Sequence, residues 1–489
     1  MTALAWAVVV VVGALTPAAP APLTPCTLGH PTGARAYASC GEVAVAIDPA
    51  HPEQTVGIGF AVLSPTGTSP RPDPIVLLAG GPGQAATRDF VALLPLVSAL
   101  RADHALVLVD IRGTGRSQPQ SCKDERPLSE RVRNQEDLDA ALACARTLTL
   151  DPHFITTADA ARDVDAVRGA LGFARWNVLG ISYGTRLAVV YDQLFPGRAR
   201  TLILDGVAPL DRALGEDVPA DMTAALRAAG DDVVQSFVAL KARLKAAPQI
   251  VKVPHPTTAL PMELTVNADV VNGTVRMLLY ADESRALLGP VLQRALGSTG
   301  RSGSPLTDTE AGGPREATRR EGSADVAGDL TPLVALAISV GEQLEDAIHG
   351  PVNASILCAE DAPFFGDEPP PKDAVFDDER PYIRALCAQW PHANVPQPRM
   401  KATTTPALLL SGELDPITPP RHARRIEKQF ADHAHIVIPG LGHSILARGC
   451  VEDIVADFVN AGTAKDLDSS CTKKIGPFPP FADLMGPAP

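Results

Sequence analysis

The stretch Trp176–Leu194, WNVLGISYGTRLAVVYDQL, decides the fold of this 489-residue chain. A short, mainly apolar run opens it, and a Gly-x-Ser-x-Gly motif centred on Ser182 separates that run from a segment with helical periodicity, Thr185–Leu194. The glycines of the motif, Gly180 and Gly184, allow a strand and a helix to approach closely around a tight turn. The stretch therefore predicts a buried strand, a sharp turn that presents Ser182, and a helix.

Similar apolar runs lie on both sides of this stretch, and each of the first three along the chain is bounded by Pro, Gly or Asp. Segments with helical periodicity separate several of them, as in Ala158–Leu171, and a last helix is expected near Val451–Val459. Strands that alternate with helices predict an α/β fold with a mostly parallel central sheet and helices on both faces. The runs are Val43–Ile47, Val56–Leu63, Ile75–Ala79, Ala105–Val109, Thr201–Leu204, Ala407–Leu410 and His435–Ile438.

The strand pattern stops after Asp205-Gly206-Val207, and about two hundred residues follow before it resumes. Such a gap predicts a large insertion into the core, mainly helical over its first part. A stretch rich in Gly, Ser, Thr, Arg and Glu inside the insertion predicts a flexible loop. The expected division is core residues 22–207, a cap or lid insertion over 208–400 that contains the loop 297–329, and core residues 401–489 with a tail.

Two further side chains follow strands in the order that a serine nucleophile requires. Asp415 comes just after the run Ala407–Leu410, and His443 lies in a glycine-containing loop after His435–Ile438. A serine hydroxyl is a poor nucleophile until an imidazole accepts its proton and a carboxylate fixes the tautomer of that imidazole. The sequence therefore predicts Ser182 as nucleophile, His443 as base and Asp415 as its acid partner.

A glycine-rich turn, Gly80-Gly81-Pro82-Gly83, directly follows the strand Ile75–Ala79. Attack on a carbonyl creates an oxyanion that needs backbone N–H donors. Gly81 and Tyr183, the residue after the nucleophile, are the predicted donors, with Gly83 as second choice in the loop because Pro82 has no N–H. We interpret the loop Asp110–Ser117 as a structural brace for this site.

The composition excludes several other classes of protein. Hydrophobic residues make up 45% of the chain and charged residues 20%, as in a soluble globular protein. The formal charge of −13 argues against a nucleic-acid partner, because binding phosphate backbones needs a concentrated basic surface. No Cys-x-x-Cys or tight Cys/His cluster indicates a metal, and the predicted chemistry requires no cofactor.

The first residues predict export. Residues 1–21 combine an apolar run with a small-residue stretch, as in a signal peptide, and we expect no stable membrane insertion after its removal. A lipoprotein signal ending at Cys26 is disfavoured by Pro25. Eight cysteines, an even number, fit a secreted or periplasmic protein; they allow 105 connectivities, of which we favour sequential pairing because they fall into four local couples. These pairs are Cys26–Cys40, Cys122–Cys144, Cys358–Cys387 and Cys450–Cys471.

Together, these motifs resemble those of the proline iminopeptidase-like α/β-hydrolases, and more closely the secreted bacterial tripeptidyl aminopeptidase group. The resemblance runs from about Val56 to Cys471 and is thin within the insertion. Its marks are Gly80-Gly81-Pro82-Gly83, Asp110-Ile111-Arg112-Gly113-Thr114-Gly115, Gly180-Ile181-Ser182-Tyr183-Gly184, Glu413-Leu414-Asp415-Pro416-Ile417-Thr418-Pro419 and Gly440-Leu441-Gly442-His443.

The resemblance implies a serine exopeptidase that removes one to three residues from peptide N-termini, under a helical cap. Such an enzyme must bind a substrate with a free α-ammonium group, and the family uses acidic residues near the cap for this purpose. Glu360 and Asp361 are the candidates, either as that subsite or as a solvated acidic pair, and Asp377-Asp378-Glu379 is a rival. The alternative function is a carboxylic-ester hydrolase, since the same catalytic groups serve esters and amides.

Overall fold

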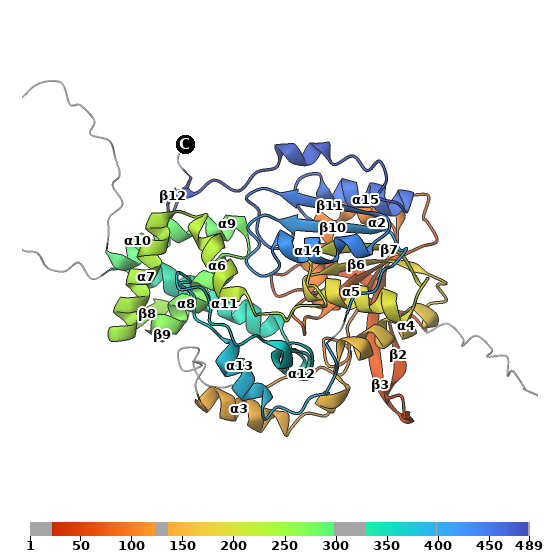
Figure 1. The fold of residues 1–489 in the computed structure, drawn as a ribbon, viewed down its shortest axis with the longest axis horizontal. Coiled ribbons are helices and arrows are strands. Elements are labelled where there is room, and N and C mark those ends of the chain that lie inside the picture. Colours follow the sequence, from red (N-terminus) through yellow and green to blue (C-terminus); the bar gives the residue numbers. More distant parts are fainter. Residues whose placement is uncertain (1–21, 123–134, 298–327, 398, 488–489) are drawn as a thin grey trace, which may run out of the picture.

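A computed structural model describes residues 22–122, 135–297, 328–397 and 399–487 of the chain. The predicted signal peptide and almost all of the predicted flexible loop, residues 298–327, lie outside the described residues. The fold has two parts, a sheet with helices on both faces and a mainly helical insertion beside it (Figure 1).

The central sheet has nine strands in the order β1-β2-β3-β5-β4-β6-β7-β10-β11. The strands from β5 to β11 in this order run parallel, whereas β1, β2 and β3 pair antiparallel at one edge. The predicted fold class, a mostly parallel α/β sheet, is confirmed. The strands are β1 (Thr24–Gly29), β2 (Arg35–Asp48), β3 (His51–Leu63), β4 (Ile75–Leu78), β5 (Leu106–Val109), β6 (Trp176–Ile181), β7 (Ala199–Asp205), β10 (Ala407–Gly412) and β11 (His433–Ile438).

Helices cover both faces of this sheet because its central strands are apolar on both sides. Every residue of β4 and β5 is buried, and alternate residues point into two separate cores. Val76 packs with α4, α5 and α14 on one face, whereas Leu77 packs with α1, α2 and α15 on the other. These helices are α1 (Ala86–Leu93), α2 (Ser98–Asp103), α4 (Thr157–Ala170), α5 (Tyr183–Leu194), α14 (Pro420–Ile426) and α15 (Val451–Ala461).

The insertion lies between the end of β7 and the start of β10 and has a core of its own, which includes Met222, Phe237 and Leu240. It is mainly helical, but it also contains a two-stranded hairpin that the sequence did not predict. Figure 1 shows its first helices at one side of the molecule and α12 next to the core. Its elements are α6 (Val218–Arg227), α7 (Asp231–Ala246), β8 (Gln249–Pro254), β9 (Pro261–Val266), α8 (Ala268–Leu278), α9 (Asp282–Arg285), α10 (Leu288–Leu296), α11 (Thr331–Ala347), α12 (Gly350–Glu360) and α13 (Arg380–Cys387).

Four disulfides fasten the described part of the chain. Each joins neighbouring cysteines along the sequence: Cys26–Cys40, Cys122–Cys144, Cys358–Cys387 and Cys450–Cys471. The first joins strands β1 and β2, and the third joins helices α12 and α13. Within the described ranges, no helix combines the length and the apolar character needed to cross a membrane.

Candidate active site

Ser182 lies on a strained turn between β6 and α5. Its backbone has φ 57° and ψ −124°, in the region of positive φ that side chains rarely adopt. The flanking glycines make the turn possible: a Cβ on Gly180 would lie 2.2 Å from the carbonyl oxygen of Gly184, and one on Gly184 would lie 2.2 Å from that of Leu78. The N–H of Ser182 donates to the carbonyl of Asp205 at 2.8 Å. The geometry is that of a nucleophile elbow.

His443 and Asp415 form a hydrogen-bonded pair at the ends of β11 and β10. The distance from Nδ1 of His443 to Oδ2 of Asp415 is 2.8 Å, and the Asp415 side chain is fully buried. The other carboxylate oxygen accepts the N–H groups of Ile417 and Thr418 at 2.9 and 2.8 Å, and the Thr418 hydroxyl donates to Oδ2 at 2.7 Å. These contacts fix the orientation of the carboxylate toward the imidazole.

The electrostatics of the pair favour the charged form of each partner. Burial alone would raise the pKa of Asp415, but the charge and hydrogen bond of His443 hold it below its usual value. Burial likewise opposes the charge on His443, but Asp415, and to a lesser extent Asp205, raise the pKa of the imidazole. Because Nδ1 faces Asp415, Nε2 is the nitrogen able to accept a proton from a nucleophile.

The sheet brings the three predicted residues to the side at which its parallel strands have their carboxyl ends. Ser182 follows β6, Asp415 follows β10 and His443 follows β11, and only β7 separates β6 from β10 in the sheet. Gly206, just after β7, lies against the imidazole, since a Cβ there would be 3.0 Å from Cε1 of His443. Carboxyl ends of parallel strands at one edge are the usual place for catalytic groups in open α/β sheets.

Asp205 supports this site and was not recognised from the sequence. Its buried carboxylate accepts the Ser444 hydroxyl at 2.6 Å and the N–H groups of Ile445 and Leu446 at 3.0 Å. Its carbonyl oxygen holds the N–H of Ser182. One residue at the end of β7 therefore fixes both the turn that carries the serine and the loop that carries the histidine.

The predicted oxyanion donors lie on two elements beside Ser182. The glycine loop after β4 approaches the serine, since a Cβ on Gly80 would be 3.1 Å from the Cβ of Ser182, and Gly81 follows with φ 106°. Tyr183 is the first residue of α5, where backbone N–H groups have no partner within the helix. Its side chain is buried with its hydroxyl 2.9 Å from the Thr157 hydroxyl, and burial raises its pKa well above the usual value.

The loop Asp110–Ser117 braces this region through buried contacts. The Asp110 carboxylate accepts the N–H and the hydroxyl of Thr87 at 2.9 and 2.6 Å, at the start of α1. Arg112 forms a two-pronged ion pair with Asp163 of α4 at 2.9 and 2.7 Å. These contacts match the structural role that we assigned to the loop.

Glu360 and Asp361 lie at the end of α12 and are buried rather than solvated. Glu360 accepts the N–H and the hydroxyl of Thr157, both at 2.6 Å. Asp361 forms a fully buried ion pair with Arg186 of α5 at 2.9 Å and accepts the N–H of Leu214. Both residues thus attach α12 to the core, while Oδ2 of Asp361 is buried and has no hydrogen-bond partner among the described residues.

The rival acidic run is also paired with basic side chains of the chain. Asp377 lies 3.0 Å from Lys241, Asp378 lies 2.8 Å from Arg380, and Glu379 contacts Arg276. The partners of Asp377 and Glu379 are residues of α7 and α8. These carboxylates tie together parts of the insertion.

A residue of the insertion contacts the candidate base. The carbonyl oxygen of Tyr280 accepts the N–H of His443 at 2.6 Å, and the two rings meet edge to face with centroids 5.5 Å apart. Arg285 donates to the carbonyl of Gly440 in the same loop. The insertion therefore holds the histidine loop as well as covering the core.

One group of possible metal ligands occurs in the part of the chain that the structure describes: Asp217, Asp221 and His422, whose ligand atoms lie within 4.8 Å of one another. Arg212 is paired with Asp217 at 2.5 Å, and Arg421 with Asp221 at 2.6 Å. The two guanidinium groups already neutralise these carboxylates, so the donor set does not suit a divalent cation.

Comparison with known proteins places the chain in a family. Residues 73–449 match the family model described as "alpha/beta hydrolase fold". The chain therefore belongs to the alpha/beta hydrolase fold family and is a hydrolase. Within this family it is similar to proteins named as peptidases.

A tripeptidyl aminopeptidase of Streptomyces coelicolor is 36% identical over 189 residues, which cover 34% of this chain and 35% of that protein. The match thus spans about a third of that relative. The serine protease Hip1 of Mycobacterium tuberculosis is 25% identical over 92% of this chain and 91% of that protein. Among solved structures, a proline iminopeptidase of Mycobacterium smegmatis covers 86% of this chain and 98% of its own, with a TM-score of 0.40 and 17% identity.

Proposed function

We propose that this hydrolase is a serine exopeptidase that releases one to three residues from peptide N-termini through an acyl-enzyme. The observation that carries the proposal is the buried Asp415–His443 pair at the same sheet edge as the elbow of Ser182. The catalytic groups alone do not distinguish peptides from esters, because they hydrolyse both. The proposed peptidase specificity is therefore supported by the names of the relatives.

In the proposed reaction, Oγ of Ser182 attacks the carbonyl carbon of the scissile bond while Nε2 of His443 accepts its proton. Asp415 stabilises the imidazolium that forms, and the N–H groups of Gly81 and Tyr183 donate to the oxyanion. The imidazolium then protonates the leaving amine, and the N-terminal fragment stays as an ester on Ser182. Water activated by His443 hydrolyses this ester and regenerates the enzyme.

The proposal includes a subsite for the substrate ammonium group. We assign Glu360 and Asp361 to it: both carboxylates are buried at the end of α12, and among the described residues Oδ2 of Asp361 has no hydrogen-bond partner. Arg186 and the N–H of Leu214 both donate to the other oxygen of Asp361, so an ammonium group at Oδ2 would add to these contacts rather than replace them. The name of a relative, tripeptidyl aminopeptidase, also supports recognition of a free N-terminus.

We also propose that the protein acts outside the cytoplasm. Four disulfides are typical of proteins that fold in an oxidising compartment, and the expected signal peptide agrees with them. When the native host is fractionated, we expect to recover the protein from the medium or the periplasm. Recovery only from the cytoplasm with reduced thiols would contradict this location.

The test of function combines a mechanistic probe with matched substrates. A fluorophosphonate should label the wild-type protein at Ser182 and leave Ser182→Ala unlabelled. The wild type should cleave aminoacyl- or tripeptidyl-anilides and refuse their N-acetylated forms, and mass analysis of a peptide-library digest should show fragments of one to three residues. Turnover of p-nitrophenyl esters with every anilide untouched would instead establish the alternative, a carboxylic-ester hydrolase.

A further inference from the structure

Helix α12 of the insertion begins directly against the glycine loop. The N–H of His349 donates to the carbonyl of Gly83 at 2.9 Å, and the Asn353 side-chain amide donates to the carbonyl of Pro82 at 3.0 Å. The approach is close, since a Cβ on Gly83 would lie 2.8 Å from the carbonyl oxygen of His349. Two hydrogen bonds thus hold the two residues that follow Gly81.

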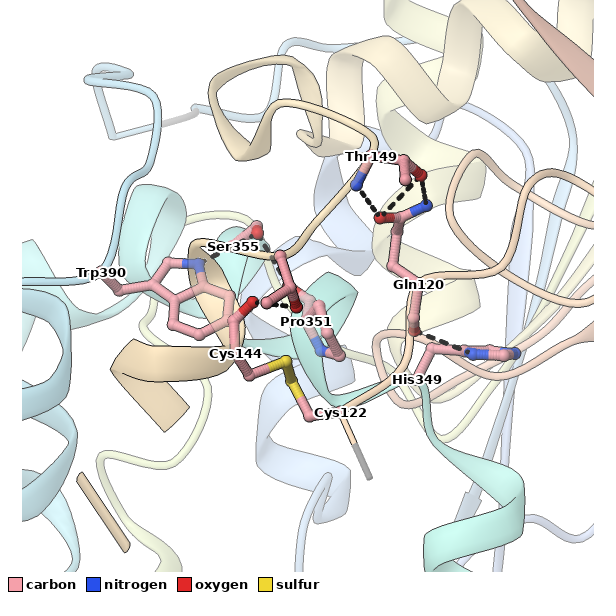
Figure 2. Close-up of a disulfide and its surroundings, with 9 residues drawn as sticks. Gln120, Cys122, Cys144, Thr149, His349, Pro351, Ser355 and Trp390 are labelled. Atoms are coloured by element: carbon pink, nitrogen blue, oxygen red, sulfur yellow. Dashed lines mark hydrogen bonds between the residues drawn. A yellow bond between two sulfur atoms is a disulfide. The ribbon is translucent and has the colours of Figure 1, made fainter. Parts of the chain in front are cut away.

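The imidazole of His349 fastens the same end of α12 to the bracing loop. Its Nε2 accepts the N–H of Gly115 at 3.1 Å, so that Nδ1 carries the proton and donates to the carbonyl of Gln120 at 3.2 Å (Figure 2). Burial lowers the pKa of this histidine, which favours the neutral form that the two contacts require. Gln120 in turn accepts the N–H of Thr149.

The other end of α12 reaches the second predicted oxyanion donor. Glu360 accepts two hydrogen bonds from Thr157, whose hydroxyl meets that of Tyr183 at 2.9 Å. Next to Glu360, Asp361 is paired with Arg186, which lies three residues after Tyr183 on α5. The 11-residue helix, about 16 Å long, therefore connects the two elements that supply the oxyanion donors.

The helix is itself held in place from its outer side. A disulfide joins Cys358 to Cys387 of α13. The indole N–H of Trp390 donates to the Ser355 hydroxyl at 3.1 Å, and that hydroxyl donates to the carbonyl of Pro351 (Figure 2). Most of its residues are buried. Such a helix is a rigid connection rather than a part of a movable lid.

We propose that α12 is a positioning element of the oxyanion hole, and that Asn353 is its principal positioning residue. The helix sets the separation between the N–H groups of Gly81 and Tyr183, by holding the glycine loop at one end and α5 at the other. The insertion is then a part of the catalytic machinery. This inference rests on the proposed serine mechanism and adds to it the origin of the oxyanion geometry.

The test uses Asn353→Asp, which replaces the donor by a carboxylate that repels the Pro82 carbonyl, and Asn353→Ala, which only removes the donor. Loss of one oxyanion donor costs about 10²–10³ in kcat, so displacement of the loop should cost roughly 10- to 100-fold. A simple ester substrate serves as readout because it does not depend on peptide specificity. We expect kcat to fall, KM to stay within about twofold, and affinity for a boronic acid that mimics the tetrahedral adduct to fall in parallel with kcat/KM.

Thr223→Val is the matched control, in helix α6 of the insertion and away from α12. It removes a buried hydroxyl that accepts the N–H of Val375, and it should lower the melting temperature as much as the Asn353 variants do, without a comparable loss of kcat. A folded Asn353→Ala or Asn353→Asp with wild-type kcat and boronate affinity would overturn the positioning role while the serine mechanism stands. A parallel loss in Thr223→Val would equally overturn it, since the effect would then be one of stability. Failure of the wild type to react with a fluorophosphonate would overturn the proposed function itself.

Discussion

Replacing Asp205 by Asn tests whether one carboxylate organises the catalytic loop. In the wild type this carboxylate accepts hydrogen bonds from Ser444, Ile445 and Leu446 at 2.6 to 3.1 Å. An amide has only one acceptor oxygen, so in either orientation its NH₂ group faces at least one backbone N–H. A lost hydrogen bond to a buried charged group costs about 1.5–3 kcal/mol, and we expect a loss of unfolding free energy of about that size.

The same substitution should change catalysis in a way that a general loss of stability would not. Asp205 holds the residue after His443, so its replacement shifts the imidazole and lowers kcat by roughly 10- to 100-fold. Its charge also helps to raise the pKa of His443. Because the base works in its neutral form, a lower pKa should move the acid limb of the kcat/KM profile to lower pH.

The assay is a pH–rate profile for Asp205→Asn beside urea denaturation of the same preparation. Ser444→Ala is the control, because it removes one hydrogen bond and leaves the carboxylate charge in place. The control should lose about 1 kcal/mol and keep the acid limb where the wild type has it. An unchanged stability of Asp205→Asn, or an acid limb that moves to higher pH, would refute the reasoning.

Three other predictions follow from buried groups. Burial holds the pKa of His349 in the folded protein below its unfolded value, which is about 6.5. The stability that the neutral imidazole supports is therefore fully present above about pH 6.5 and should fall as the pH drops below that value. His349→Gln should remove this part of the acid sensitivity, as measured by thermal melting at several pH values. Replacing Cys358 and Cys387 by Ala opens a loop of 29 residues and should lower the free energy of unfolding by about 3 to 4 kcal/mol, as measured by denaturant titration. A clearly smaller loss would contradict the view that this disulfide stabilises the fold by closing the loop. Arg112→Ala leaves Asp163 buried without its partner and should destabilise the fold by about 3–5 kcal/mol, a cost that Asp163→Asn in the same background should partly relieve.

The sheet could be predicted from the sequence because its central strands carry an unbroken apolar signal. The runs Ile75–Ala79 and Ala407–Leu410 coincide with β4 and β10 to within two residues. Strand β1 was missed, since TPCTLG at the sheet edge is mostly exposed and has no such signal. The β8–β9 hairpin was missed for a similar reason: alternate residues of both strands are exposed, and Ile250 of β8 is 65% accessible.

The candidate site was predictable where a residue type and a motif coincide, and not where a contact joins distant segments. Ser182 is marked by the glycines around it, and His443 by its place after a strand. Asp205 could be read only as the end of a strand, because its partners lie 239 to 241 residues further along the chain. The burial of Glu360 and Asp361 likewise depends on Thr157 and Arg186, which neighbour them only in the folded chain.

The contacts between the insertion and the catalytic loops explain why the role of the insertion in holding these loops could not be predicted from the sequence. His443 donates its N–H to the Tyr280 carbonyl, and His349 donates its N–H to the Gly83 carbonyl, so both links are made by the backbone. A backbone link survives most substitutions of the side chain and therefore leaves no pattern in the sequence. Such a link requires only that the backbone of the insertion follows the same course past the catalytic loop. Variation of most insertion side chains should thus alter substrate preference before it alters catalysis; the exceptions are side chains that themselves make a link, as Asn353 does to Pro82 and Arg285 to Gly440.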